Sequence, residues 1–102
     1  MNLDELVDHV RHGEPLQRID LSQVDATGAD LSGGIFDRVK MPIRMAGALL
    51  KESLLTACDL TGCDLSASDL HLANITDSKL EGTRLDRAQL VSATFLKSSL
   101  TA

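Results

Sequence analysis

The second half of the chain repeats every five residues. From Leu50 onward, each fifth position is apolar and a small residue stands two places before it. The apolar series, which we call the centres, is Leu50, Leu55, Leu60, Leu65, Leu70, Ile75, Leu80, Leu85, Leu90, Phe95 and Leu100. The first half repeats in a second frame, one residue out of phase, with centres at Leu16, Leu21, Ala26, Leu31, Phe36 and Met41.

A period of five suits neither a helix nor a flat strand. Five residues turn an α-helix by about 500°, so successive centres would spiral around it and form no common face. On a strand, an odd period would send successive centres to opposite faces. The chain must therefore bend at each repeat, and stacked coils of such a chain bury a continuous column of leucines.

Several repeats share a tripeptide with a known family. The chain reads Ala29-Asp30-Leu31, Cys58-Asp59-Leu60, Cys63-Asp64-Leu65, Ser68-Asp69-Leu70 and Ala73-Asn74-Ile75. This pattern resembles the Ala-(Asp/Asn)-Leu motif of pentapeptide-repeat proteins. The resemblance implies an all-β solenoid, a right-handed quadrilateral β-helix of about 4 to 4.5 coils with four repeats per coil. The chain departs from the motif at Ala26 and Met45, both centres, and at the small position Gly34.

The first residues predict an amphipathic helix that caps this solenoid. Asn2 suits the N-cap, and Glu5 completes a capping box three residues later. An apolar stripe follows helical spacing at Leu3, Leu6, Val7 and Val10. Gly13 is the expected residue just beyond the helix end. We therefore expect a capping helix over residues 1–13 and a β-helix over residues 14–102.

The two frames meet near Pro42, where the simplest join removes one residue between 42 and 45. It makes Met45 a centre and Ile43 the inward residue two places before it. Outward positions test this join independently. They form the columns Asp20, Lys40, Asp59, Lys79, Ser99 and Asp25, Arg44, Asp64, Arg84, with Asp77 over Lys97. We call the two long columns the charge ladders, because acid and base alternate in them and favour a single register.

Composition excludes several function classes. The net charge of −5, from 10 basic and 15 acidic residues, argues against direct nucleic-acid binding. No apolar run approaches the ~20 residues of a membrane span, and no signal peptide is visible, so we expect a cytoplasmic protein. Cys58 and Cys63 fall on inward positions, which predicts buried structural thiols rather than a metal or redox site. We expect His9, His12 and His71 to be solvated, and we expect no enzyme activity and no cofactor.

The remaining candidates for a functional site are exposed residues on the surface of the solenoid. Large outward apolar residues lie on the two sides that lack the charge ladders. They predict a face that binds a protein partner, formed by Ile35, Leu49, Leu54, Leu72, Val91 and Leu96. The last repeats predict a tail-to-tail homodimer through Leu85, Leu90, Phe95 and Leu100. The alternative is that the chain is a fragment of a longer protein.

Two other functions follow from the family resemblance. Some pentapeptide-repeat proteins mimic duplex DNA and bind type II topoisomerases such as gyrase. A rod of ~20 Å would have to imitate about 12 phosphate charges, which a net charge of −5 does not supply. The chain could also be a repeat module of a bacterial secretion or effector-delivery protein.

Overall fold

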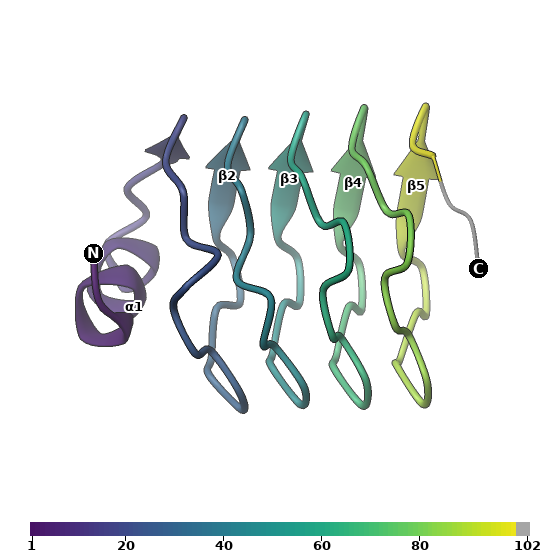
Figure 1. Cartoon of the computed structure of the whole chain (residues 1–102), viewed down its shortest axis with the longest axis horizontal. Helices are drawn as coiled ribbons and strands as arrows, with labels where there is room; N and C mark the ends of the chain where they lie inside the picture. Colours follow the sequence, from purple (N-terminus) through teal and green to yellow (C-terminus); the bar gives the residue numbers. More distant parts are fainter. Residues whose placement is uncertain (100–102) are drawn as a thin grey trace.

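A computed structural model describes residues 1–99 and shows a right-handed quadrilateral β-helix capped by one helix (Figure 1). The elements are α1 (Leu3–Arg11), β1 (Leu16–Gln17), β2 (Ile35–Asp37), β3 (Leu54–Thr56), β4 (Asn74–Thr76) and β5 (Thr94–Leu96). The five strands form one parallel sheet in the order β1-β2-β3-β4-β5. This architecture confirms the expected fold class.

Helix α1 covers the first coil of the stack (Figure 1). The Asn2 side chain accepts a hydrogen bond from the Glu5 N–H at 2.9 Å, and the Glu5 carboxylate accepts one from the Asn2 N–H at 3.0 Å. Leu6 and Val10 are buried in the common core. Gly13 has φ +67°, as expected of the residue that ends a helix.

The centres stack directly above one another. The sheet pairs Leu16 with Phe36, Phe36 with Leu55, Leu55 with Ile75, and Ile75 with Phe95. A second side shows how the coils are bonded. The Leu60 N–H donates to the Lys79 carbonyl at 2.8 Å, and the Lys79 N–H donates to the Cys58 carbonyl at 3.0 Å. Every centre from Leu16 to Leu80 is buried.

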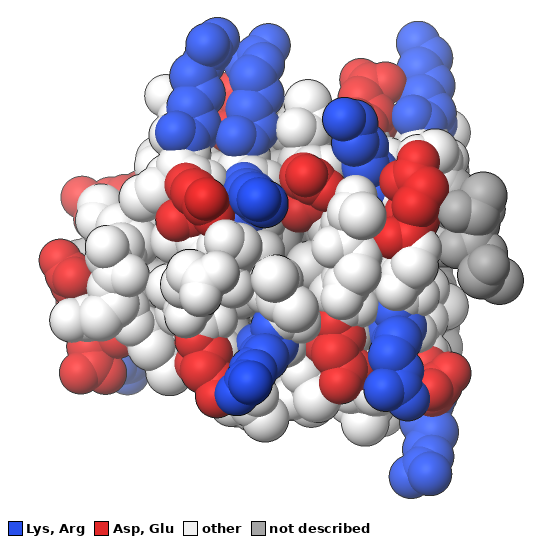
Figure 2. Space-filling model, in the orientation of Figure 1, with Lys and Arg blue, Asp and Glu red and all other residues white. Residues whose placement is uncertain are grey.

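The outward columns also have the predicted partners. Lys40 pairs with Asp20 and Asp59, and Arg44 pairs with Asp25 and Asp64. The ladders appear as two rows of alternating red and blue along the rod (Figure 2). Within the described part of the chain, one ladder contact closes to an ion pair, Arg44 Nη1 to Asp25 Oδ2 at 3.9 Å. The ladders therefore act mainly through alternation of charge.

The aspartates of the repeats have a second role that our sequence analysis missed. Each closes a turn by accepting the N–H two residues further on, as Asp59 does from Thr61 at 2.9 Å and Asp69 from His71 at 3.0 Å. The same bond forms at Asp20, Asp25, Asp30 and Asp64. The Asp-x-Ser/Thr spacing was the visible signal for it.

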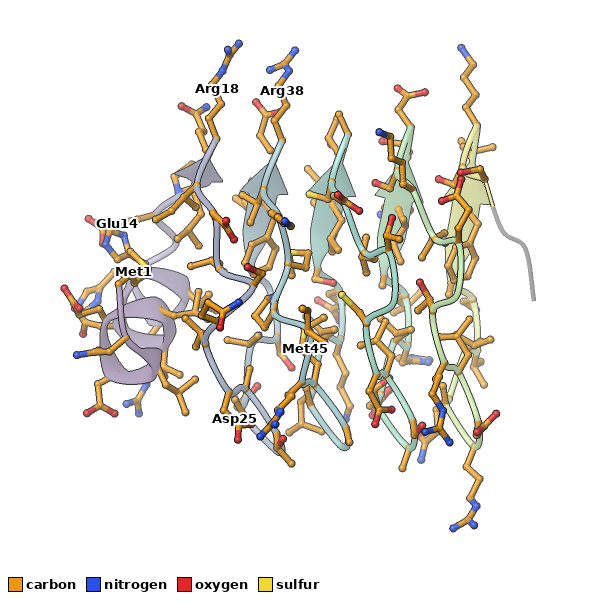
Figure 3. All side chains as sticks on the ribbon, in the orientation of Figure 1. Met1, Glu14, Arg18, Asp25, Arg38 and Met45 are labelled. Carbon is orange, nitrogen blue, oxygen red and sulfur yellow. The ribbon has the colours of Figure 1, made fainter. Side chains whose placement is uncertain are left out.

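The join near Pro42 confirms one part of the expectation and corrects another. Pairing over twenty residues, as in Asp20 with Lys40, becomes pairing over nineteen in Asp25 with Arg44. Met45 is fully buried, as a centre should be, and points into the interior, whereas Arg18 and Arg38 project outward (Figure 3). Ile43 does not point inward: it is 43% exposed. With one residue missing, the segment has no room for both a turn and an inward side chain.

The thiols lie in the core, as predicted. Cys58 and Cys63 are buried, and the Cys58 Sγ lies 3.4 Å from the Phe36 carbonyl oxygen. Burial raises the pKa of the Cys63 thiol to about 12 and raises the pKa of Cys58 as well. Both groups are therefore protonated at neutral pH and serve as small apolar filling.

Gly34→Ala tests the packing of the shaft. A Cβ at this buried position would lie 2.5 Å from Phe36 Cε2 and 3.0 Å from the Leu31 carbonyl oxygen. Because coils enclose the ring on both sides, we expect the free energy of unfolding to fall by about 1–3 kcal/mol, measured by urea denaturation. In a Phe36→Leu background the same substitution should be much less costly; an equal cost in both backgrounds would contradict the steric explanation.

The turn aspartates predict an acid-sensitive fold. Two hydrogen bonds from the Ser or Thr two residues further along lower the pKa of Asp20, Asp25, Asp59 and Asp64 below the ordinary 3.8. The larger effect comes from the hydroxyl of that residue and the smaller from its backbone N–H. A lowered folded-state pKa gives stability that is present above the unfolded pKa and is lost as pH falls through the folded value. We therefore expect the free energy of unfolding to decrease below about pH 4.

Replacing these four aspartates by asparagine provides the matched control. Asparagine can accept the same turn hydrogen bond but does not titrate. Urea unfolding followed by circular dichroism at several pH values should show a shallower acid dependence for the variant. Parallel pH profiles for the two proteins would rule out the turn aspartates as the source.

Candidate interaction surface

All six residues of the predicted face are exposed, but they do not form one cluster. Ile35 and Leu54 pair in register in β2 and β3. Leu49 lies on the neighbouring side, just before the centre Leu50, and pairs with Asp30 and Asp69. These two sides meet at a corner. Leu96 lies elsewhere, in register with Thr76 at the other end of the short strands.

The corner itself contributes two more apolar side chains. The Glu52 N–H donates to the His71 carbonyl at 2.9 Å, and the Leu72 N–H donates to the Val91 carbonyl at 3.0 Å. The successive corner turns are therefore stacked. We define the corner patch by the members that gather here, namely Ile35, Leu49, Leu54, Leu72 and Val91. It lies across the rod from the corner at which the two ladder sides meet.

Leu72 has the left-handed backbone conformation that the repeat turns share. Its φ is +60°, and the residues stacked with it in the same corner, Gly33, Glu52 and Ser92, also have positive φ. Among the described residues, Leu72 is the one large aliphatic side chain with positive φ. The left-handed region costs an L-residue roughly 1–2 kcal/mol. Nine other non-glycine residues share this conformation, so Leu72 is distinguished by its exposed aliphatic side chain and not by its backbone.

The rim of the patch is polar and carries more acidic than basic groups. The Lys51 Nζ lies 3.6 Å from Asp69 Oδ2, and only 14% of the Asp69 side chain is exposed. The pair lies directly beside Leu49, since Leu49 and Asp69 are in register. Asp30, in register with Leu49, and Glu52, in the corner turn, are also exposed, so the aliphatic groups of the patch have a mildly acidic border.

The predicted dimer surface lies on the last coil. Leu85 and Phe95 are half-buried, and Leu90 is 40% exposed, whereas the centres above them are buried. Leu100 lies outside the described residues. These side chains give the last coil an apolar surface, and the tail-to-tail homodimer stays a prediction.

The histidines do not form part of a larger polar site. His9 Nδ1 lies 3.3 Å from Glu14 Oε1, and His12 Nδ1 lies 2.8 Å from the Asp8 carbonyl oxygen. That backbone contact raises the pKa of His12 above 6.5. Within residues 1–99, no three His, Cys, Asp or Glu side chains are arranged to hold a metal ion. No helix in this range is long and apolar enough to cross a bilayer.

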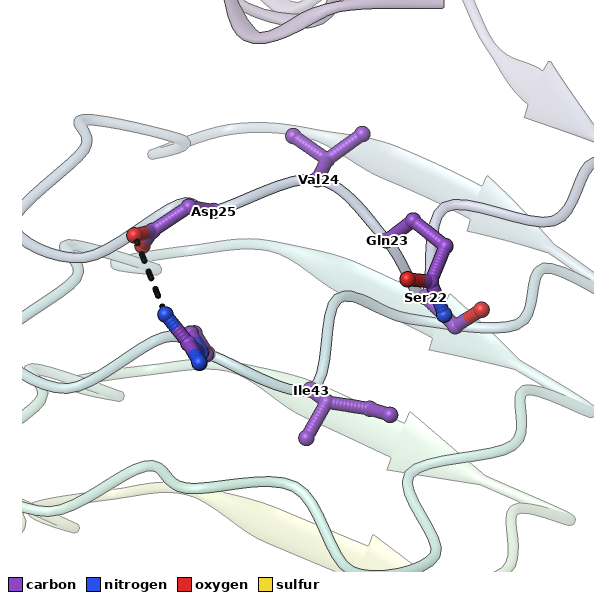
Figure 4. Close-up of a pocket in the computed structure, with 6 residues that line it drawn as sticks. Ser22, Gln23, Val24, Asp25 and Ile43 are labelled. Carbon is purple, nitrogen blue, oxygen red and sulfur yellow. Dashed lines mark ion pairs between the residues drawn. The ribbon is translucent and has the colours of Figure 1, made fainter.

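One surface feature was not predicted. A hollow of about 300 Å³ lies at the join, lined by Ser22, Gln23, Val24, Asp25, Ile43 and Arg44 (Figure 4). It also corrects the expectation that the ladder sides carry no large outward apolar residue, because Ile43 is exposed there. The missing residue was visible in the sequence, but its effect on the backbone was not.

Solved structures resemble this fold. The pentapeptide-repeat protein Rfr23 from the cyanobacterium Cyanothece 51142 is 19% identical, with a TM-score of 0.61, covering 86% of this chain and 61% of its own. HetL from the cyanobacterium Nostoc sp. strain PCC 7120, a pentapeptide-repeat protein involved in heterocyst differentiation regulation, is 26% identical with a TM-score of 0.51. That match covers 80% of this chain and 47% of HetL.

A third structure is much less similar. QnrB1, a plasmid-mediated fluoroquinolone resistance protein, is 20% identical and has a TM-score of 0.24, over 87% of this chain and 64% of its own. The chain thus spans less than two thirds of the length of each of these three proteins. A comparison with curated proteins found no match.

The sequence also matches a family profile. The profile of pentapeptide repeats, in eight copies, covers residues 16–41, 44–71 and 68–102. The gap between the matched ranges falls at 42–43, where the structure loses one residue from a repeat. With the repeats, the β-helix and the profile in agreement, the chain belongs to the pentapeptide-repeat family.

Proposed function

We propose that this chain is a non-enzymatic scaffold that binds a protein partner through the corner patch. The observation that carries the proposal is the gathering of Leu49, Leu54 and Leu72 around one corner, each about two fifths exposed. Pentapeptide-repeat proteins are generally structural or interaction scaffolds, which supports a binding role. The likeness to HetL, whose involvement is in regulation, supports a regulatory partner protein.

The energetics of the patch are adequate for recognition. Burying the remaining exposed surface of one such leucine would contribute roughly 1–2 kcal/mol. A few adjacent side chains of this kind commonly supply most of the affinity of an interface. The coil stack holds them on a hydrogen-bonded backbone, so little conformational freedom is lost when a partner binds.

The charge pattern does not favour DNA mimicry. The longest dimension of the molecule is 31 Å, and duplex DNA of that length carries about 18 phosphate charges. The chain has a net charge of −5, and Lys40, Lys79, Arg44 and Arg84 interrupt its acidic rows. The likeness to QnrB1, at a TM-score of 0.24, carries no argument for a shared target.

The double substitution Leu54→Ser, Leu72→Ser should abolish partner binding and leave the fold intact. Both side chains are exposed, so their loss removes contacts to a partner rather than core packing. The measurement compares the proteins captured from a lysate of the source organism by the wild type and by the variant.

Leu96→Ser is the matched control, because Leu96 is 57% exposed but lies outside the corner patch. It should capture the same proteins as the wild type, and all three proteins should give the same circular dichroism spectrum. Undiminished capture by the double variant would refute the corner patch as the binding surface.

Leu72→Gly separates binding from stability. Glycine removes a left-handed strain of roughly 1–2 kcal/mol, and its greater freedom in the unfolded chain offsets about 0.5–1 kcal/mol of that gain. We expect urea denaturation to show a variant at least as stable as the wild type, with weaker partner capture. A variant that is clearly less stable would show that Leu72 serves the fold instead.

A further inference from the structure

The column of outward residues that contains Leu49 departs from the pattern of the charge ladders. In both ladders a basic residue separates two aspartates, as Lys40 and Arg44 do. At the equivalent place in this column, Leu49 pairs with Asp30 on one neighbouring coil and with Asp69 on the other. A leucine therefore occupies the position at which the ladders have a positive charge, and the two aspartates lack a base between them.

One of these aspartates has a basic partner from elsewhere, and the other has none. The Lys51 Nζ lies 3.6 Å from Asp69 Oδ2. Asp30 is exposed and forms no ion pair with any residue from 1 to 99. Its carboxylate accepts the Ser32 N–H at 3.1 Å, a turn bond that leaves the negative charge uncompensated. The border of Leu49 is therefore acidic on the coil nearer to α1 and neutral on the next coil.

The corner turn repeats this arrangement one coil further along. The Glu52 N–H donates to the His71 carbonyl and the Leu72 N–H donates to the Val91 carbonyl, so Glu52 stacks on Leu72 from the coil nearer to α1. Glu52 is exposed, and it too is without an ion pair in the described part of the chain. Ser92, which is uncharged, stacks on the other side of Leu72. Two exposed leucines of the corner patch thus each have an uncompensated carboxylate on the same side.

The coil stack sets the distance between the acidic and the aliphatic groups. Adjacent coils lie about 4.8 Å apart, so a partner surface that covers the leucines also places groups beside the two carboxylates. Opposite charges across an interface favour one partner and one orientation, and like charges placed there are strongly unfavourable. The patch is therefore complementary to an aliphatic surface that carries basic groups along one edge.

We propose that the partner of the corner patch presents an amphipathic segment with an aliphatic stripe and Lys or Arg along one edge, an inference that rests on the function proposed above. The aliphatic side chains of the segment cover Leu49, Leu54 and Leu72. Its basic edge faces Asp30 and Glu52, on the side nearer to α1. The rod therefore accepts such a segment in a single orientation.

The test is a titration of the ¹⁵N-labelled full chain with a synthetic amphipathic helical peptide of leucine and lysine, its lysines along one edge of the leucine stripe. We expect saturable shifts of the Leu49, Glu52 and Leu72 amides, and none of comparable size at Leu96, outside the patch. The affinity should fall between about 0.01 M and about 0.15 M salt, because the screening length shortens from about 30 Å to about 8 Å.

A second peptide, with glutamate in place of lysine, tests the sign of the charge. It should bind more weakly by about tenfold or more, because its carboxylates would lie against those of the patch. Equal binding of the two peptides overturns the proposal, as does the absence of saturable shifts with the lysine peptide.

The double substitution Asp30→Asn, Glu52→Gln removes both charges with little change of shape, and Asp30→Asn can still accept the Ser32 N–H. It should weaken binding of the lysine peptide by about fivefold and remove most of its salt dependence. The matched control is Asp77→Asn, Asp86→Asn, which removes the same charge from exposed residues outside the corner patch. It should bind the peptide like the wild type, and an equal loss in the two variants overturns the proposal.

The same variants separate this inference from the proposed function. If Leu54→Ser, Leu72→Ser abolishes capture from the lysate while Asp30→Asn, Glu52→Gln leaves capture at low salt unchanged, the corner patch binds a partner without a basic edge, and this proposal alone is wrong. Light scattering tests a different occupant. Concentration-dependent dimerisation of the wild type that the leucine variant loses would identify a second copy of the chain on the patch, and would overturn the proposal.

Discussion

The hydrogen bonds between successive coils are the constraint on which the structure depends. Each coil must place its backbone in register with the next, as Leu60 and Lys79 do through bonds of 2.8 and 3.0 Å. This spacing fixes the height of each layer along the rod and leaves room for one aliphatic side chain and one small residue per repeat. Where Phe36 replaces an aliphatic centre, the small residue before it is Gly34, because a Cβ there would meet the ring at 2.5 Å.

The same register determines what the outer surface can carry. Because equivalent residues stack coil upon coil, the sign of a charge in one coil constrains the sign in the next. Alternation in the ladders satisfies this condition, and the aspartates within them also accept the N–H bonds that close their turns, as Asp59 does from Thr61. Two of the four sides thus serve the register. The corner farthest from them is free to present Leu54 and Leu72.

The stacking could be predicted well from the sequence because equivalent positions in successive coils have equivalent neighbours. Once Leu60 and Leu80 are assigned as centres, the neighbours of Asp59 and Lys79 follow without further information. The error at Ile43 arose because hydrophobicity alone does not give the direction of a side chain when a residue is missing. The hollow at the join could not be predicted for a related reason, because it depends on the backbone positions of two neighbouring coils, which no residue type encodes.

The surface features that distinguish this rod from a regular repeat array occur where the sequence departs from the repeat. A perfect array would bury every aliphatic group and pair every backbone amide, and would offer a partner only polar turns. Leu72 places a large aliphatic side chain at an exposed turn of positive φ, and Ile43 is exposed where a repeat lost one residue. The first departure carries a left-handed φ on a large side chain, and the second leaves a long hydrogen bond of 3.4 Å from the Ile43 N–H to the Ser22 carbonyl. Since neither improves folding, recognition is the property that such positions can serve.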